Sequence, residues 1–345
     1  MAGVDARQRG VSTSSDTFDA DTGRPFYRAP PGLDRSDATV AAYAEQTYVP
    51  TQAVVLKGGV RVDSDSRFRA VVTPRLAVGY KPWEGGTLKV SYAGAFRAPS
   101  WDEANNATAR RIVADGLRPE KVNSLELSVN QRVGTHRLLL GGFYSKWTDL
   151  VELATLTDQE TIDAIRNGQT VVPFTPGVHL TQYRNTSTVI NYGLNTGVEG
   201  AFASGHLLYG LSITGAITER ISAGRSIRLP VAPQLFGNAR IAFVLGEQLP
   251  TVGLGVRFVG PRPADLSNGF DPPPYAPAAA EFKLTLSGRA PLIDGLSYRL
   301  IVDYKTAKHG PYVVGPVTSS LPTQPAAELN PVDRFRTTAG LQYDF

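Results

Sequence analysis

The chain has 345 residues, no cysteine and a formal net charge of +4 at pH 7. Disulfide frameworks, thiolate metal sites and cysteine nucleophiles are therefore excluded, and a mild charge without basic clusters gives no case for a nucleic-acid partner. Apolar residues make up 42% of the chain, but no run approaches the roughly 20 apolar residues that a membrane-spanning helix needs. The 34 glycines and 25 prolines indicate many strands joined by loops.

The amino-terminal stretch, residues 1–37, is polar and rich in Ser, Asp, Gly and Pro. It contains no basic segment followed by an apolar stretch and a small-residue cleavage site, and so no secretory signal. We interpret this stretch as a loop.

Amphipathic strands follow one another from residue 39 onward, each about as long as a tilted membrane-spanning strand. In the second of them, for example, Val54, Leu56 and Val60 lie on one face while Lys57 and Arg61 lie on the other. The pattern predicts about 13 strands, at 39–48, 53–63, 69–80, 87–96, 121–131, 136–151, 189–201, 207–219, 235–245, 251–259, 279–289, 296–305 and 334–345.

The last of these strands ends on an aromatic carboxyl terminus. Its apolar face carries Phe335, Ala339, Leu341, Tyr343 and Phe345. A terminus of a soluble domain usually frays into water, whereas the final strand of a membrane barrel pairs with another strand and faces lipid. We therefore favour an antiparallel transmembrane β-barrel, with an edge strand of a soluble sandwich as the alternative.

Short and long connections alternate along most of the chain. The short ones are 49–52, 81–86, 132–135, 202–206, 246–250 and 290–295, and the long ones are 97–120, 152–188, 220–234, 260–278 and 306–333. Tight periplasmic turns at one rim and long extracellular loops at the other are typical of an outer-membrane barrel. Aromatic residues also tend toward strand ends, where they suit the membrane boundary, although cross-strand packing places aromatic residues there in any sheet.

Two stretches then resemble the TonB-dependent outer-membrane receptors. Residues 95–100 (AFRAPS), followed by Asp102 and Glu103, are similar to the "FRAPS" segment of that family, and residues 116–121 (GLRPEK) are similar to its "L-x-PE-x" segment. Pro99 would stop the strand that carries Phe96 from pairing further, and Pro119 would do the same where the chain returns to the sheet. Arg97 and Glu126 would then lie near the lumen or the rim, where water reaches them.

The resemblance implies a 22-stranded barrel with a plug domain inside, preceded by a signal peptide and a segment that contacts TonB. We interpret residues 1–38 as the remnant of an extracellular loop and residues 39–345 as the carboxyl-terminal part of such a barrel. The chain would be a fragment, with the plug and the amino-terminal barrel strands as its missing partners. An odd number of strands cannot close as a simple antiparallel barrel.

The function implied by the resemblance is energised uptake of a scarce ligand, most often a ferric siderophore, across the outer membrane of a Gram-negative bacterium. The implied partners are outer-membrane lipid, the barrel assembly machinery, for which Tyr343 and Phe345 would form the carboxyl-terminal signal, and the TonB complex, acting through the absent plug. Cationic and aromatic loop residues suit an anionic, catecholate-bearing iron complex. The candidate ligand contacts are Arg97, Trp101, Arg110, Arg111, Tyr183, Arg184, Phe270 and Tyr275, although solvated loops carry such residues anyway.

Other function classes are open at this point. We predict no enzyme, cofactor or resident metal, because the four histidines (His136, His179, His206 and His309) have no metal-ligand spacing and no nucleophile elbow or phosphate loop appears. A barrel lipase, a passive porin or structural barrel without energy coupling, and a soluble carbohydrate-binding β protein are the alternatives. Residues 157–166 alone read as a helix, with Thr157 or Asp158 as its cap.

Overall fold

The computed structural model describes residues 1–345 except 14–32, 106, 109, 171–175, 223, 230–231, 247–248, 264–274, 291–292, 308, 315–327, 332 and 344–345. Its main feature is one 15-stranded antiparallel sheet, in which all strands but β10 follow one another in chain order. The strands on this path are β1 (Ala2–Thr13), β2 (Leu33–Thr51), β3 (Val54–Asp65), β4 (Phe68–Tyr80), β5 (Gly86–Arg97), β6 (Glu120–Val133), β7 (His136–Thr155), β8 (Thr181–Phe202), β9 (Leu207–Ser222), β11 (Leu235–Val244), β12 (Thr251–Val259), β15 (Ala279–Arg289), β16 (Leu296–Lys305) and β19 (Phe335–Tyr343).

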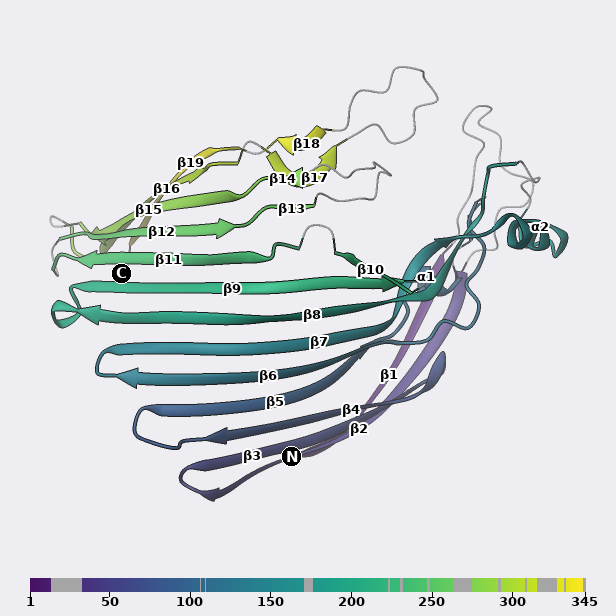
Figure 1. The fold of residues 1–345 in the computed structure, drawn as a ribbon, viewed down its shortest axis with the longest axis horizontal. Helices are drawn as coiled ribbons and strands as arrows, with labels where there is room; N and C mark the ends of the chain where they lie inside the picture. Colours follow the sequence, from purple (N-terminus) through teal and green to yellow (C-terminus); the bar gives the residue numbers. More distant parts are fainter. Residues whose placement is uncertain are drawn as a thin grey trace.

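The sheet is curved and open, with β1 and β19 at the two ends of the strand order (Figure 1). The smaller strands are β10 (Arg225–Arg228), which pairs with β9, and two separate ladders of β13 (Arg262–Pro263) with β14 (Tyr275–Ala276) and β17 (His309–Val314) with β18 (Glu328–Pro331). Three short helical elements complete the fold: α1 (Trp101–Asn105), α2 (Asp158–Arg166) and the 3-10 turn η1 (Ala203–Gly205). Neither α1 nor α2 is long and apolar enough to cross a membrane.

The all-β antiparallel prediction is confirmed, and each of the 13 predicted strands has its counterpart in the sheet. The predicted alternation of connections also holds along most of the chain: most tight turns cluster at one end of the sheet, and α1 and α2 lie at the other (Figure 1). The tight β3–β4 turn is an exception, because it lies at the end that carries α1. The predicted helix is α2, whose amino-terminal cap is Thr157.

One prediction was wrong for part of the amino-terminal segment. Residues 2–13 form β1 instead of a loop, and β2 begins at residue 33 instead of 39. The polar composition hid a strand whose outward positions are small: Ala2, Val4 and Ala6 pair with Ala44, Ala42 and Val40. Because β1 adds one strand, the path holds an even number of strands and not 13.

The two faces of the sheet differ sharply in chemistry. Directly paired residues point to the same side, and one row runs Tyr92, Leu125, Tyr144, Tyr192 and Ile217 across β5 to β9. We call this side the apolar face. Its leucines are exposed, among them Leu127, Leu140 and Leu194, as expected of a surface that meets lipid instead of water.

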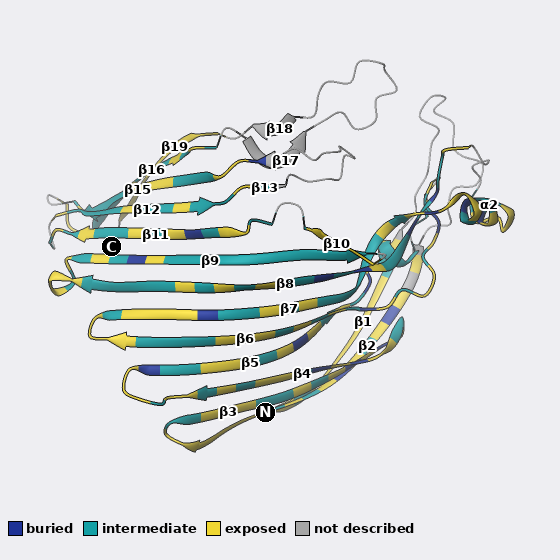
Figure 2. Ribbon diagram, in the orientation of Figure 1, coloured by how far each residue is buried: buried dark blue, intermediate teal, exposed yellow. Residues whose placement is uncertain are grey.

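The opposite side, which we call the polar face, carries ion pairs between the strands. Arg61 contacts Asp5 at 2.7 Å and Asp63 at 2.8 Å, and Lys57 contacts Glu45 at 2.9 Å. Few residues of the sheet are buried (Figure 2), because a single layer has no second layer to cover either face. The sheet is therefore held together by its hydrogen-bonded ladders and cross-strand pairs more than by a core.

Glycines let large rings lie across the neighbouring strand. Gly193 lies directly opposite Phe143 and packs under its ring, and a Cβ at Gly193 would stand 2.8 Å from that ring. Gly237 takes the same place beneath Phe258, also at 2.8 Å. These close approaches fill the gap that glycine leaves in a strand and help fix the register of the pairs.

Candidate functional site at the loop rim

The candidate site lies where β5 to β8 pass into their long connections. There the 98–119 connection and the 156–180 connection pack on each other. Their shared apolar core consists of Ile112, Leu156, Ala164 and Leu180, each at most 5% exposed. Backbone bonds join the 98–119 connection to the start of β8, where the 156–180 connection ends: the Thr181 amide donates to the Arg110 carbonyl at 2.9 Å, and the Ile112 amide donates to the Thr181 carbonyl at 3.0 Å.

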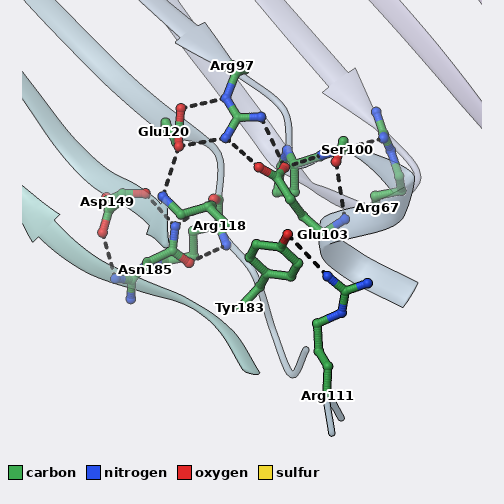
Figure 3. Close-up of polar contacts among 12 residues, drawn as sticks. Arg67, Arg97, Ser100, Glu103, Arg111, Arg118, Glu120, Asp149, Tyr183 and Asn185 are labelled. Atoms are coloured by element: carbon green, nitrogen blue, oxygen red, sulfur yellow. Dashed lines mark hydrogen bonds and ion pairs between the residues drawn. The ribbon is translucent and has the colours of Figure 1, made fainter. Parts of the chain in front are cut away.

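Arg97, the last residue of β5, holds the base of this unit together (Figure 3). Its Nε and Nη2 donate to the two carboxylate oxygens of Glu120 at 2.6 and 2.7 Å, and its Nη1 and Nη2 donate to Glu103 at 3.0 and 2.9 Å. Glu120 also accepts the Val151 amide at 2.8 Å. The arginine of the FRAPS-like segment and the glutamate of the L-x-PE-like segment thus form one fork-to-carboxylate pair.

Glu103 belongs to α1 and completes a capping box with Ser100. The Ser100 amide donates to the Glu103 carboxylate at 2.7 Å, and the Glu103 amide donates to Ser100 Oγ at 3.1 Å. Burial would raise the pKa of Glu103, but the hydrogen bonds from Arg97 and Ser100 outweigh it and hold the pKa below the ordinary value. Glu103 is therefore a carboxylate at neutral pH, which fixes α1 against the end of β5.

Arg118 makes a second brace toward β7 and β8 (Figure 3). The Arg118 amide donates to Asn185 Oδ1 at 2.9 Å, and Asn185 Nδ2 donates back to the Arg118 carbonyl at 3.0 Å. The Arg118 guanidinium contacts Asp149 through Nη2 at 2.6 Å. Asp149 has a positive φ of 58° beside the irregularity in the β7–β8 ladder. Arg118 thereby joins the end of the 98–119 connection to β7 and β8 at this irregularity.

Arg111 and Tyr183 are brought together, as Figure 3 shows. The Arg111 guanidinium carbon lies 5.3 Å from the Tyr183 ring centroid, and Arg111 Nη1 donates to the Tyr183 hydroxyl at 3.4 Å. Asp102 is the nearest carboxylate, at 3.9 Å. Arg111 Nε and Trp101 Nε1 are buried and have no hydrogen-bond partner in the described part of the chain.

The other sequence-predicted ligand residues are spread differently. Arg110 is exposed and takes part through its carbonyl, whereas Arg184 Nη1 donates to Glu160 at 2.7 Å and its Nε donates to Gln182 at 2.8 Å. Tyr275 lies in the separate β13–β14 ladder, and Phe270 lies outside the described residues. The structure therefore joins Trp101, Arg110, Arg111, Tyr183 and Arg184 in one unit with Arg97 at its base.

Sequence reasoning missed Arg67, in the turn between β3 and β4. Arg67 donates to the Pro99 carbonyl at 3.1 Å, contacts Asp65 at 2.9 Å and Asp37 at 3.3 Å, and lies 5.8 Å from the Trp101 ring centroid. It thus anchors α1 to β3 and β2. Because neighbouring strands run in opposite directions, the β3–β4 turn lies at the same rim as the FRAPS-like segment. This shared rim was the one signal in the sequence that could have suggested Arg67.

The carboxyl-terminal residues are described only in part. Tyr343 pairs with Leu296 on β16, while Phe345 lies outside the described residues, so their role as an assembly signal stays a prediction. Among the described side chains, no group of three or more His, Asp or Glu is placed to hold a metal ion.

A curved antiparallel sheet with one apolar face, one polar face and structured loops at one rim is typical of a membrane β-barrel. The chain belongs to the TonB-dependent receptor-like β-barrel family, whose family model matches residues 2–300. No curated protein sequence matches it.

Solved structures of the same family share the fold at low sequence identity. The chain is similar to the copper transporter OprC (16% identity, TM-score 0.70, all of this chain and 54% of that one). It is also similar to the FrpB iron transporter of Neisseria meningitidis (14%, 0.68, all of this chain and 52% of that one). A third is a variant of the ferric enterobactin receptor PfeA of Pseudomonas aeruginosa in complex with enterobactin (14%, 0.72, all of this chain and 51% of that one). The chain thus spans about half the length of these structures.

Proposed function

We propose that this chain forms the loop-bearing part of an outer-membrane receptor that takes up a ferric siderophore with energy from the TonB complex. The support is the family membership, the apolar face suited to lipid, and similar structures whose names state iron, enterobactin or copper. The plug through which TonB would act, and the strands needed to close the barrel, would come from outside the described sheet.

The observation that carries the proposal is the rim unit with Arg111 at its centre. Most rim cations already have carboxylate partners, since Arg97 pairs with Glu103 and Glu120, and Arg184 with Glu160. Arg111 instead lies against a ring, with its nearest carboxylate at 3.9 Å. A cation with a ring beside it suits an anionic ligand that carries aromatic groups.

We therefore divide the predicted residues by role. Trp101, Arg110, Arg111 and Tyr183 are proposed as the ligand-contacting surface, and Arg97 and Arg184 are proposed to brace it. Phe270 and Tyr275 stay predictions from sequence.

Binding tests the first half of this proposal. The chain, folded in neutral detergent, is titrated with the ferric tris-catecholate complex of 2,3-dihydroxybenzoate while its tryptophan fluorescence is recorded. A parallel titration with the gallium complex separates binding from quenching by iron. We expect saturable binding that weakens about tenfold in Arg111→Met, equivalent to about 1.4 kcal/mol. Arg166→Gln removes an exposed cation from the neighbouring 156–180 connection and should bind like the parent. Equal binding by the Arg111→Met and parent proteins would refute the assignment.

Uptake tests the second half. In cells that carry the complete gene, accumulation of the labelled iron complex should disappear when TonB is deleted. Accumulation that continues without TonB would indicate the passive porin alternative instead.

A further inference from the structure

Two lysines stand on the apolar face just above its row of tyrosines. Lys121 lies opposite Thr148, and Lys146 lies opposite Asn123, on the neighbouring strands β6 and β7. The two lysines are therefore diagonal neighbours, about 7 to 8 Å apart in such a ladder. Both are exposed.

Strand alternation fixes the face on which they lie. Lys146 is two residues from Tyr144, and Lys121 is four residues from Leu125, so each points to the same side as that neighbour. Tyr144 and Leu125 are themselves a directly opposed pair in the tyrosine row. The lysines thus lie one and two register steps beyond the apolar band, on the side of the long loops.

Their electrostatic setting differs from that of the polar face. On the polar face Lys57 contacts Glu45 at 2.9 Å and Lys283 contacts Asp303 at 3.5 Å. Neither Lys121 nor Lys146 has a carboxylate within 4.0 Å in the described part of the chain.

The surroundings add no compensating negative charge. The row of Lys146 continues through Ile190 to Glu219, and Glu219 is itself opposed by Arg228 on β10. On the other side Asn123 Oδ1 accepts a hydrogen bond from the Tyr92 hydroxyl at 2.8 Å. The patch therefore keeps a net positive charge directly above tyrosine rings.

We propose that Lys121 and Lys146 bind the phosphate groups of a lipid headgroup in the outer leaflet. Tyrosines mark the level at which acyl chains give way to headgroups, so cations one or two register steps higher lie at the level of lipid phosphates. Each basic residue near an anionic lipid surface strengthens attachment about fivefold. This inference rests on the outer-membrane placement in the proposed function, but not on the siderophore.

Native mass spectrometry in neutral detergent provides the test, with bisphosphorylated lipid A and zwitterionic phosphatidylethanolamine as probes. We expect the parent chain to retain lipid A in preference to phosphatidylethanolamine. The Lys121→Gln/Lys146→Gln double variant should bind lipid A about 25-fold more weakly. Lys89→Gln is the matched control, because Lys89 is an exposed lysine of the same sheet that lies on the polar face, opposite Ser128. It should bind like the parent.

A folding defect is separated from lost binding by the Lys121→Arg/Lys146→Arg variant, which keeps both charges and should keep the affinity. Equal lipid A binding by the Gln double variant and the parent would overturn the proposal, as would an equal loss in Lys89→Gln. Displacement of lipid A by millimolar inorganic phosphate would also overturn it, in favour of a soluble-phosphate site. Failure of the chain to associate with any detergent or lipid would instead refute the membrane placement itself.

Discussion

Removing the Arg97 side chain should loosen the base of the rim unit without disturbing the sheet. Arg97→Met takes four charge-assisted hydrogen bonds from Glu103 and Glu120 and leaves the two carboxylates facing each other. Their side chains are 16% and 13% exposed, whereas that of Arg97 is 48% exposed, so water compensates part of the loss. We estimate about 1–2 kcal/mol of local stability, between a surface pair and a fully buried charged hydrogen bond.

Amide hydrogen exchange measures this local stability directly. The Ser100 amide donates to Glu103 and the Val151 amide donates to Glu120, so both amides report on carboxylates that lose Arg97. One to two kcal/mol corresponds to roughly fivefold to thirtyfold faster exchange at these two positions. Adding Glu120→Gln to Arg97→Met should cost less than the sum of the single changes, because the two residues share one interaction.

The control lies at the opposite rim. Arg137 has a similar exposure and contacts Glu199 at 3.6 Å, so Arg137→Met removes an equivalent cation and should leave the exchange of Ser100 and Val151 unchanged. The Arg132 amide, which donates to the Gly85 carbonyl at 2.8 Å, should exchange equally in all variants. If the Arg97 and Glu120 changes add within about 0.3 kcal/mol, the two residues are not coupled and the brace is refuted.

Two further predictions concern the sheet and α2. Gly237→Ala should destabilise the sheet by about 1–3 kcal/mol, because the added Cβ would collide with the backbone of β9 and with the Phe258 ring. Gly255→Ala is the control and should be tolerated, because its Cβ would meet no atom closer than 3.9 Å. Urea titration in detergent compares the two variants, and equal unfolding midpoints would contradict the packing argument. Hydrogen bonds from the Thr157 amide and from Arg184 lower the pKa of Glu160 to about 2, so its stabilisation of α2 should be complete above about pH 4.3 and fade as the pH falls toward 2. Glu160→Gln should therefore speed amide exchange in α2 severalfold at pH 7 and have a much smaller effect near pH 2. An effect of equal size at both values would show that the carboxylate charge is irrelevant.

The sequence was sufficient for the strands because a single-layer sheet between two different environments imposes strict alternation. Thr251–Val259 and Leu296–Lys305 were predicted with the bounds that the structure gives. The strand Ala2–Thr13 was not predicted, because small residues occupy its apolar positions. Alanine there is too weakly hydrophobic to outweigh the charges of Asp5, Arg7 and Arg9 in the sequence pattern.

Side-chain partners at the rim were harder to predict. Arg97 and Glu120 are 23 residues apart, and their meeting depends on β5 and β6 being neighbours in register, which alternation alone does not fix. Arg67 depends on a still more distant contact, because it donates to the Pro99 carbonyl, which is 32 residues away along the chain. The pairing of Arg111 with Tyr183 likewise follows from two long connections packing on each other.

The two motifs that carried the family resemblance act on the position of the loop more than on a ligand. The Pro99 carbonyl is held by Arg67, and Glu120, directly after Pro119, is held by Arg97 and by the Val151 amide. Both ends of the 98–119 connection are thus fixed to strands. A change in this brace should alter the presentation of any ligand to a similar degree, because it moves the whole connection.

Ligand specificity would then belong to residues that the brace carries and the motifs do not include. Arg111 lies against the Tyr183 ring, and neither residue takes part in the pairs of Arg97 with Glu103 and Glu120. Substitutions there should change the affinity for an aromatic, anionic iron complex more than for an uncharged one, because only the former uses both the cation and the ring.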